Sequence, residues 1–347
     1  MFETNHAPLS KERLKQLLAN ADHAKIGLIG DLCLDMYWLA DMKKSELSRE
    51  TPHYPLPVVE ERYAPGGAGN AACNIAALKP GVLKVIGLVG EDWRGDLLIK
   101  ALAERGIGGE TIVRDVSVTT NAYIKPLRRG ISDVTYEDPR LDFENYAPIA
   151  ETAEQKVLAA LDAAAPELDV ICVSDQMRFG CITPAIRARL SELGAAGKIV
   201  IVDSRYRAAD YKNVTVKPNE VEAVRAFADG SPRDLRGLSE LTAAISLKND
   251  RLTLTTLGDQ GCFVAENGAV VRIPACPVEP PIDFCGAGDT FLAGFGTMLA
   301  GGASPTEAAK VANLCAAVTI KKLGTTGTAS REEVLVAHDL FFKGENS

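Results

Sequence analysis

The sequence predicts an α/β protein in which a mainly parallel sheet is covered by helices on both faces, with a small second β sheet beside it. Short apolar stretches such as KIGLIGD (25–31) and DVICVSD (169–175) have the length of buried strands and alternate with helical stretches of 10–15 residues. This alternation is typical of parallel strands buried on both faces. Two turn-rich segments of short strands, 36–64 and 119–146, interrupt it and are expected to pair into the small sheet.

The elements of the first half follow from local patterns. The stretch SKERLKQLLAN (10–20) predicts a short amphipathic helix with Ser10 as its N-cap, ahead of the strand at 25–31. A Pro-Gly-Gly turn at 65–67 then leads into an alanine-rich helix. The further elements expected here are helix 69–79, strand 84–90, helix 95–106 and strand 110–115.

The alternation resumes after residue 146 and ends with two or three helices. The elements expected in between are helix 151–164, strand 169–175, helix 183–197, strand 198–203, helices within 219–247, strand 251–258, and a hairpin of strands 261–266 and 269–274. We therefore expect an α/β core formed by residues 1–35, 65–118 and 147–347, and a β lid formed by residues 36–64 and 119–146.

Composition and charge disfavour several classes of protein. The 347-residue chain is 46% hydrophobic and has a formal net charge of −8, which argues against a general nucleic-acid or anionic-membrane surface. It begins without a signal-peptide pattern, and its apolar runs are too short to cross a membrane. The eight cysteines are scattered without a C-x-x-C pair, which predicts reduced core thiols. We expect a cytoplasmic protein without nucleic-acid or membrane partners.

The strongest motif is DFCGAGDTFLAGFGTMLAGG, from Asp283 to Gly302. Its glycines, Gly286 and Gly288, leave the backbone bare just before a predicted helix, whose unpaired N–H groups and positive dipole end stabilise a phosphoryl group. Asp289 lies in the first turn of that helix, where a carboxylate can take the proton of an attacking hydroxyl. The alternative is a glycine turn with an aspartate at an ordinary helix start.

A second motif, PGGAGNAACNIAAL, begins at Pro65. Its glycines allow a ligand to approach the backbone, and Asn70 can donate to and accept from sugar hydroxyls. The same residues match a loose dinucleotide fingerprint, with Glu91 and Asp92 about twenty residues further on. That fingerprint has to follow a buried strand directly, and the preceding residues, EERYAP, do not have this pattern.

Three weaker signals lie elsewhere. Asn219 and Glu222, in KPNEVEA after Lys217, can hold Mg²⁺ waters and phosphate or can simply start a helix. TLGDQG (256–261) places a glycine turn after a strand, where ligands of open α/β sheets bind. Asp31 and Asp35 follow the first buried strand and would suit a polyol, although a strand-end turn explains them equally well. The chain contains no G-x-x-x-x-G-K-[ST] loop, H-R-D loop or H-E-x-x-H motif.

These motifs, in this order, resemble those of the ribokinase-like carbohydrate kinases, also called the PfkB family, over roughly residues 25–335. Gly66–Asn70 matches the family's first signature and Asp283–Asp289 matches its second, with N-x-x-E and T-x-G-x-x-G elements between them. The resemblance implies a ribokinase-like three-layer α/β/α fold with a β-sheet lid. It also implies phosphoryl transfer from ATP with Mg²⁺, and a homodimer formed through the lid.

The resemblance further implies a role for each matching residue. Asp289 would be the base, with the N–H groups of Gly286, Ala287 and Gly288 as the anion hole. Mg²⁺ and phosphate would be organised by Asn219 and Glu222. The ATP side would be lined by Thr256, Gly258, Gly261 and Asn313, and the sugar side by Asp31, Asp35, Gly66, Gly67, Asn70 and Asp142.

The stretches GDLCLDMYW, RLDFEN, VICVSD and NLCAAVTIKKLGTTG are similar to the heptose 7-phosphate kinase domain of bacterial ADP-heptose synthesis. Phe284 and Cys285 depart from the family, which commonly has a threonine there, and this puts a monovalent-cation site in doubt. The lid stretch SELSRETPHYPLPVV also differs from that subgroup.

The resemblance implies that the substrate is a sugar or a sugar phosphate. Basic side chains can read a substrate phosphate, and the candidates are Lys125, Arg128, Arg129, Arg140, Arg205 and Arg207, each of which would otherwise be an ordinary surface charge. Two further hypotheses are a free-sugar kinase of ribokinase or fructokinase type and a non-catalytic sugar- or nucleotide-sensing protein on the same scaffold.

Overall fold

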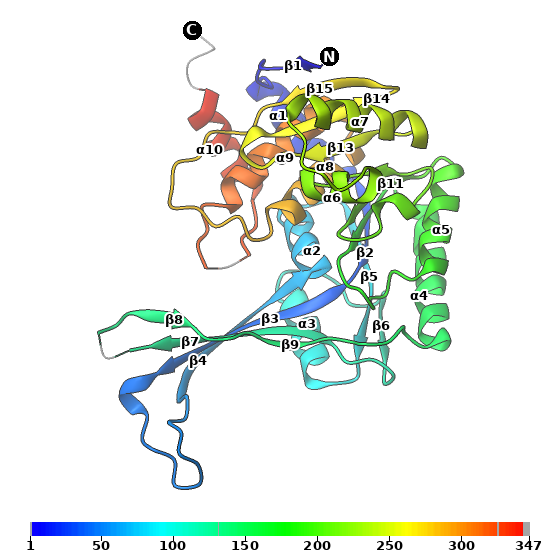
Figure 1. The fold of residues 1–347 in the computed structure, drawn as a ribbon. Helices are drawn as coiled ribbons and strands as arrows, with labels where there is room; N and C mark the ends of the chain where they lie inside the picture. Colours follow the sequence, from blue (N-terminus) through cyan, green and yellow to red (C-terminus); the bar gives the residue numbers. More distant parts are fainter. Residues whose placement is uncertain (1, 131, 325, 343–347) are drawn as a thin grey trace.

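The central feature of the computed structural model, which describes residues 2–130, 132–324 and 326–342, is a large twisted sheet (Figure 1). Ten described strands form it in the order β1-β15-β14-β13-β12-β11-β10-β2-β5-β6. Neighbouring strands of this sheet run parallel to each other, except in the pairs β13–β14 and β14–β15, which are antiparallel. The strands are β1 Glu3–Thr4, β2 Lys25–Gly30, β5 Val82–Gly90, β6 Ile112–Asp115, β10 Val170–Asp175, β11 Ile199–Ser204, β12 Thr215–Val216, β13 Thr253–Thr256, β14 Cys262–Glu266 and β15 Ala269–Ile273.

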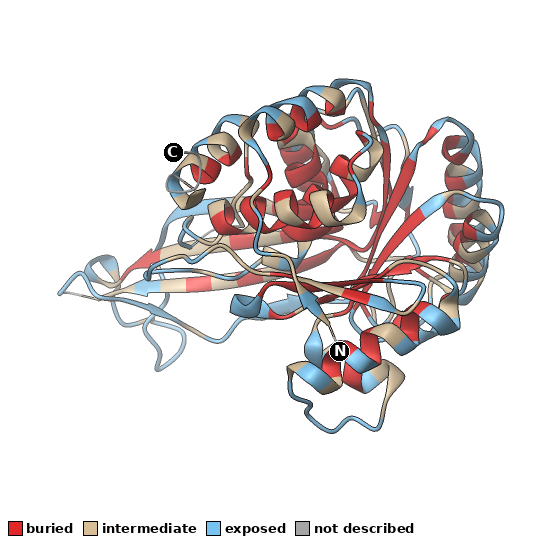
Figure 2. Ribbon diagram, turned by 90° about the horizontal axis from the view of Figure 1, so that it is seen from above, coloured by how far each residue is buried: buried red, intermediate tan, exposed pale blue. Residues whose placement is uncertain are grey.

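Helices cover both faces of the large sheet, so the prediction of a three-layer α/β/α fold is confirmed (Figure 2). Because successive strand residues point to opposite faces, Ile26 and Leu28 of β2 join one apolar cluster and Ile29 joins the other. The first cluster packs under α1 Lys11–Asn20, α2 Ala68–Ala77, α3 Trp93–Ala103, α8 Ala287–Ala300, α9 Pro305–Thr319 and α10 Arg331–Phe342. The second packs under α4 Glu151–Ala164, α5 Pro184–Ala195, α6 Glu220–Phe227 and α7 Leu235–Asn249.

A smaller sheet projects from one side of the molecule (Figure 1). Its strands are β4 Val58–Gly67, β3 Leu32–Asp41, β7 Asn121–Arg129 and β8 Thr135–Glu137 in that order, with β9 Leu141–Phe143 also pairing with β7. One face is apolar and buried, as Leu34 and Ile124 show. On the other face Asp35, Tyr123 and Asp142 lie in register on three neighbouring strands, so they form a polar row.

Most predicted elements are present, and the differences have local causes. Ser10 caps α1 as expected, its hydroxyl accepting from the amide of Arg13 at 3.2 Å. The two-residue strand β1 was not predicted, because so short a segment carries no periodicity. The short strands expected from residue 36 onward begin earlier, because β3 runs from Leu32 to Asp41 and alternate residues such as Leu34 and Met36 pack inward.

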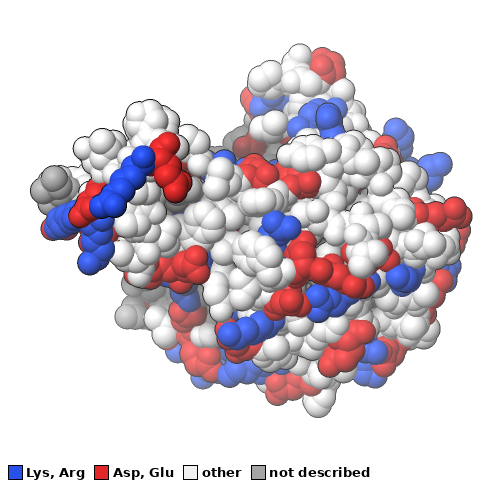
Figure 3. Space-filling view, turned by 90° about the horizontal axis from the view of Figure 1, so that it is seen from below, with Lys and Arg blue, Asp and Glu red and all other residues white. Residues whose placement is uncertain are grey.

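The eight cysteines are free, and six of them are buried, whereas Cys276 is half-buried and Cys285 is exposed. In the described part of the chain, no helix has the length and apolar character needed to cross a membrane. On the face drawn in Figure 3, basic and acidic side chains are interspersed.

Candidate active site

The main candidate site is a cavity of about 460 Å³ at the carboxyl ends of the parallel strands, beside the first turn of α8. Ligands of open α/β sheets bind at this edge. Every residue predicted for the reaction centre or for the ATP side lines this one cavity: Asn219, Glu222, Thr256, Gly258, Gly261, Gly286, Ala287, Gly288, Asp289 and Asn313. They are contributed by the segments around α6, β13, α8 and α9.

The glycine turn before α8 has a left-handed backbone at Gly286, with φ of 78°. A Cβ atom at Gly286 would also lie only 2.6 Å from Nδ2 of Asn70, so both conformation and space favour glycine there. One of the three predicted anion-hole amides is already used, because Ala287 donates to the carbonyl of Phe284 at 3.1 Å. Within the described residues, the amides of Gly286 and Gly288 have no protein acceptor.

Asp289 lies in the first turn of α8 and is oriented by Asn70, whose Nδ2 donates to its Oδ2 at 2.8 Å. Burial raises the pKa of Asp289 to about 7, and the negative charge of Asp203 adds to the rise, whereas Asn70 and Lys217 lower it. A carboxylate with a pKa near neutral pH is well matched to act as a general base.

Lys217 and Asp203 form a buried ion pair in the cavity wall, and this pairing was not predicted from the sequence. Nζ of Lys217 lies 2.9 Å from Oδ2 of Asp203, and both side chains are buried. Burial lowers the pKa of Lys217, but the charges of Asp203 and Glu222 outweigh it, so the net pKa is raised and the ammonium keeps its proton. Both residues follow the register pair Val202–Val216 of β11 and β12, a pairing that single-strand patterns do not reveal.

Asn219 and Glu222 form a capping box at the start of α6, so this motif does start a helix. Its role toward Mg²⁺ and phosphate stays a prediction. Oδ1 of Asn219 accepts from the amide of Glu222 at 2.8 Å, and Oε2 of Glu222 accepts from the amide of Asn219 at 3.0 Å. The other oxygen of the Glu222 carboxylate is not used by the box. Burial and the charge of Asp203 raise the pKa of Glu222.

The residues predicted for the sugar side lie next to this cavity and not in its wall. Asn70 contacts Asp289, and Gly67 is the N-cap of α2, just before Asn70. The backbone of Gly66 lies against the half-buried carboxylate of Asp35. Because α2 follows β4 of the small sheet, it lacks the preceding parallel strand that the dinucleotide fingerprint requires.

Two acidic residues are placed differently from the rest of that group. Asp142 is in the polar row, but Arg140 holds it with two contacts of 2.6 and 2.7 Å. Asp31 is only 2% exposed and lines neither this cavity nor the one described next. Its carboxylate accepts three backbone amides instead, from Gln176, Met177 and Cys181, at 2.7–2.9 Å. In this structure the oxygens of Asp31 accept from backbone amides, and its predicted contact with a sugar stays a prediction.

A second cavity of about 270 Å³ adjoins the first, because Gln176 and Arg205 line both. Its other walls come from β7, with Tyr123, and from the loop after β10, with Arg178. Of the six basic side chains predicted to read a phosphate, Arg205 lines both cavities and Lys125 lies over the Tyr37 ring. The other four are each engaged by an aspartate, namely Arg128 by Asp138, Arg129 by Asp41, Arg140 by Asp142 and Arg207 by Asp175.

Comparison with known proteins agrees with this geometry. A family model described as pfkB family carbohydrate kinase matches residues 29–332. The bifunctional protein HldE of Bradyrhizobium diazoefficiens is 33% identical over 313 residues, covering 88% of this chain and 61% of that protein. HldE of Geobacter sulfurreducens is 33% identical over 334 residues, covering 94% and 65%. The chain thus spans under two thirds of the length of these relatives.

Solved structures show the same fold. Arabidopsis thaliana ribokinase, complexed with ribose and ATP, has a TM-score of 0.68 at 18% identity, covering 91% of this chain and 99% of that one. Phosphofructokinase-2 from Escherichia coli also has a TM-score of 0.68 at 18% identity, covering 92% and 99%. Because the family model covers most of the chain, the protein belongs to the pfkB family of carbohydrate kinases.

Proposed function

We propose that this protein transfers the γ-phosphate of ATP to a hydroxyl group of a sugar or sugar phosphate, with Asp289 as the general base. The observation that carries the proposal is the position of Asp289. It lies where the cavity formed by the predicted nucleotide-side residues meets Asn70, close enough to Asp35 of the small sheet for that charge to raise its pKa. A carboxylate held there reaches an acceptor on one side and a phosphate on the other.

The reaction follows from these positions. Asp289 accepts the proton of the acceptor hydroxyl while that oxygen bonds to the γ-phosphorus, and the bond between that phosphorus and the ADP oxygen breaks. Asn70 keeps the carboxylate aimed at the hydroxyl. The free amides of Gly286 and Gly288 and the ammonium of Lys217 stabilise the charge on the transferring group. The small sheet acts as a lid that keeps water out.

The cavity also suits the magnesium ion that accompanies ATP. Mg²⁺ prefers oxygen ligands and keeps several waters, so one or two carboxylates and the nucleotide phosphates are enough to hold it. Glu222 and Asp203 line the cavity, and the oxygen of Glu222 that the capping box leaves unused and the carboxylate of Asp203 would provide such ligands. Among the described residues no cluster of three or more acidic, histidine or cysteine side chains forms a closed metal cage. The ion, when bound, neutralises phosphate charge.

We infer that the acceptor is a sugar phosphate, with a heptose 7-phosphate as the specific candidate. The sequence resembles heptose 7-phosphate kinase domains in four stretches, and the HldE relatives align with most of the chain. Arg205 and Arg178 line the second cavity, where guanidinium groups suit a phosphate on the far end of the acceptor. A free-sugar kinase is the alternative, and it would leave these arginines without a ligand.

The test is ADP release with Mg-ATP against heptose 7-phosphate, hexose phosphates and free sugars. We expect turnover with the phosphorylated heptose at a kcat/KM at least tenfold above that with free sugars. Turnover confined to free sugars would keep the mechanism and reject the sugar-phosphate acceptor. ATP binding without turnover on any member of the panel would favour the sensing hypothesis.

Asp35→Ala is expected to raise KM for the acceptor about 10- to 100-fold, because hydrogen bonds to a charged group contribute about 1.5–3 kcal/mol each. The Kd of ATP should change less than twofold, since Asp35 lies outside the nucleotide cavity. Steady-state kinetics and calorimetry measure the two quantities. Asp41→Ala, further along β3 and paired with Arg129, is the control. An equal loss of ATP affinity would contradict the placement of Asp35.

The pH profile of kcat/KM for the acceptor is expected to rise with pH and to level off above a midpoint of about 7. The sign follows from the chemistry, because Asp289 works as a base only when deprotonated and burial raises its pKa to about 7. The measurement should use a non-phosphorylated acceptor as well, since a phosphate ester titrates near 6. A midpoint at or below pH 5 would contradict this assignment.

A further inference from the structure

Residues 176–181 form the loop by which the chain leaves β10 at the carboxyl edge of the large sheet. Gln176, Met177, Arg178 and Phe179 of this loop line the second cavity, opposite Tyr123 of the small sheet. A loop in this position needs partners for its backbone groups, because unpaired buried N–H and C=O groups are costly. Two charged side chains from outside the loop supply these partners.

Asp31 binds the amide groups of the loop. Its Oδ2 accepts from the amides of Gln176 at 2.9 Å and Met177 at 2.7 Å, and its Oδ1 accepts from that of Cys181 at 2.9 Å. The backbone of Asp31 is tied as well, since its N–H donates to Ser174 and its carbonyl accepts from Ala68, the first residue of α2. Asp31 therefore connects the loop to β10 and to the helix that carries Asn70.

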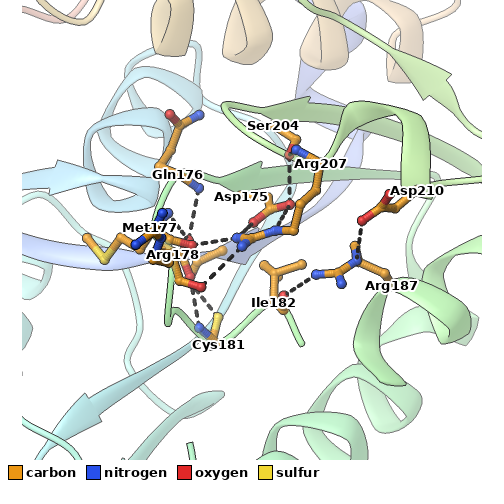
Figure 4. Close-up of polar contacts among 12 residues, drawn as sticks. Asp175, Gln176, Met177, Arg178, Cys181, Ile182, Arg187, Ser204, Arg207 and Asp210 are labelled. Carbon is orange, nitrogen blue, oxygen red and sulfur yellow. Dashed lines mark hydrogen bonds and ion pairs between the residues drawn. The ribbon is translucent and has the colours of Figure 1, made fainter. Parts of the chain in front are cut away.

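Arg207 binds the carbonyl groups of the same loop (Figure 4). Its guanidinium donates to the carbonyl of Met177 and, at 3.1 Å, to that of Arg178. Asp175, which is fully buried, fixes the guanidinium by two contacts. Asp175 is itself held by Ser204 at 2.7 Å and by the hydroxyl of Tyr211 at 3.0 Å. The carboxylate of Asp31 thus accepts hydrogen bonds from the N–H groups of the loop, and the guanidinium of Arg207 donates hydrogen bonds to its carbonyl groups.

Burying the Asp31 carboxylate under the loop costs free energy, and the loop packs closely against it. Burial and the nearby charge of Asp175 raise the pKa of Asp31 to about 6, against the effect of the three amides. A Cβ atom on Gly180 would lie 1.9 Å from Oδ1 of Asp31, so only glycine allows the loop to close over this carboxylate. Buried charges carry a large desolvation penalty, so the pairing of these backbone groups requires the burial of two carboxylates, Asp31 and Asp175.

We propose that Asp31 and Arg207 are positioning residues that clamp the 176–181 loop in the shape required to bind the acceptor. This rests on the proposed kinase function, in which the second cavity receives the far end of the acceptor. Neither residue contacts the nucleotide cavity. We expect the main effect on the acceptor, because Met177, Arg178 and Phe179 of the loop line only the second cavity, whereas Gln176 lines both.

Asp31→Asn is the first test. Asparagine keeps the shape of the side chain but points an NH₂ group at an amide that needs an acceptor. We expect KM for the acceptor to rise about 10- to 100-fold, with the Kd of ATP changed less than twofold. Amide hydrogen exchange at residues 176, 177 and 181, measured without substrates, should become faster.

Arg207→Lys is the second variant, in case Asp31→Asn does not fold. Lysine keeps the positive charge and loses the planar fork that reaches two carbonyls and Asp175 together. We expect the same acceptor-only rise in KM. Arg189→Lys, on α5 and paired with Asp162 and Glu192, is the matched control and should leave every readout unchanged.

The outcomes separate the two proposals. An unchanged acceptor KM in a variant whose loop amides exchange faster would overturn the clamp, and so would an equal loss of ATP affinity. Unchanged exchange at the loop amides in both variants would overturn it too. A wild-type protein that phosphorylates no acceptor would reject the proposed function itself, independently of the exchange result.

Discussion

Asp289→Asn is expected to lower kcat by about three orders of magnitude, within the 10²- to 10⁴-fold range of general base catalysis. Asparagine has nearly the same shape and can still accept from Asn70, but it cannot take a proton. The Kd of ATP should stay within a few-fold of the wild-type value. Single-turnover kinetics with saturating ATP and acceptor measures the chemical step directly.

The same variant should be more stable than the wild type at pH 8, because the pKa of Asp289 is raised by folding. Its pKa is about 7 in the folded protein against a usual value of 3.8. As the pH rises from 3.8 to 7, the unfolded chain loses its proton first, so the stability of the folded state falls and the full penalty is present above pH 7. Replacing the carboxylate removes this penalty, so thermal unfolding at pH 8 should occur at a higher temperature.

A kcat that falls less than tenfold would reject Asp289 as the base. A loss of activity accompanied by loss of ATP binding would instead indicate that Asp289 maintains the shape of the cavity. Asp162→Asn on α4, an exposed carboxylate paired with Arg189, makes the same chemical change far from the cavity and should leave both readouts unchanged. An Asp289→Asn variant that is more stable but inactive would show that the buried carboxylate lowers the stability of the folded protein and is required for catalysis.

The layers of the fold could be predicted from sequence because each depends on a local pattern. Apolar strands of six residues such as β10 and helices such as α4 carry their own periodicity, and Ser10 marks the start of α1. The motifs also identified residues that lie together, since the glycine turn, the N-x-x-E element and the T-x-G-x-x-G element all line one cavity. Their catalytic and binding roles remain proposals.

Features that depend on distant pairs could not be predicted. Whether Asp31 faces a sugar or the interior is decided by amides 145 to 150 positions further along the chain. The contact between Lys217 and Asp203 depends on the register of β11 against β12. A single sequence gives each of these side chains a chemical type but not a partner.

Gly286→Ala is expected to reduce kcat about 100-fold, comparable to the loss of one anion-hole donor. The added Cβ would lie 2.6 Å from Nδ2 of Asn70, and Asn70 is the side chain that orients Asp289. One methyl group would therefore disturb the aim of the base and the turn that presents the free amides. The folded state should also lose about 1–2 kcal/mol, because alanine is strained at a left-handed position.

Gly302→Ala separates these two effects. Gly302 follows the other end of α8 at a φ of 83°, close to the 78° of Gly286, and a Cβ there meets nothing within 4 Å. Both variants should lose similar unfolding free energy in urea titrations, but only Gly286→Ala should lose kcat. Equal kcat losses would mean that strain in α8, and not the contact with Asn70, controls activity. An unchanged kcat in Gly286→Ala would remove the glycine turn from the catalytic machinery, because the methyl group cannot enter without moving Asn70.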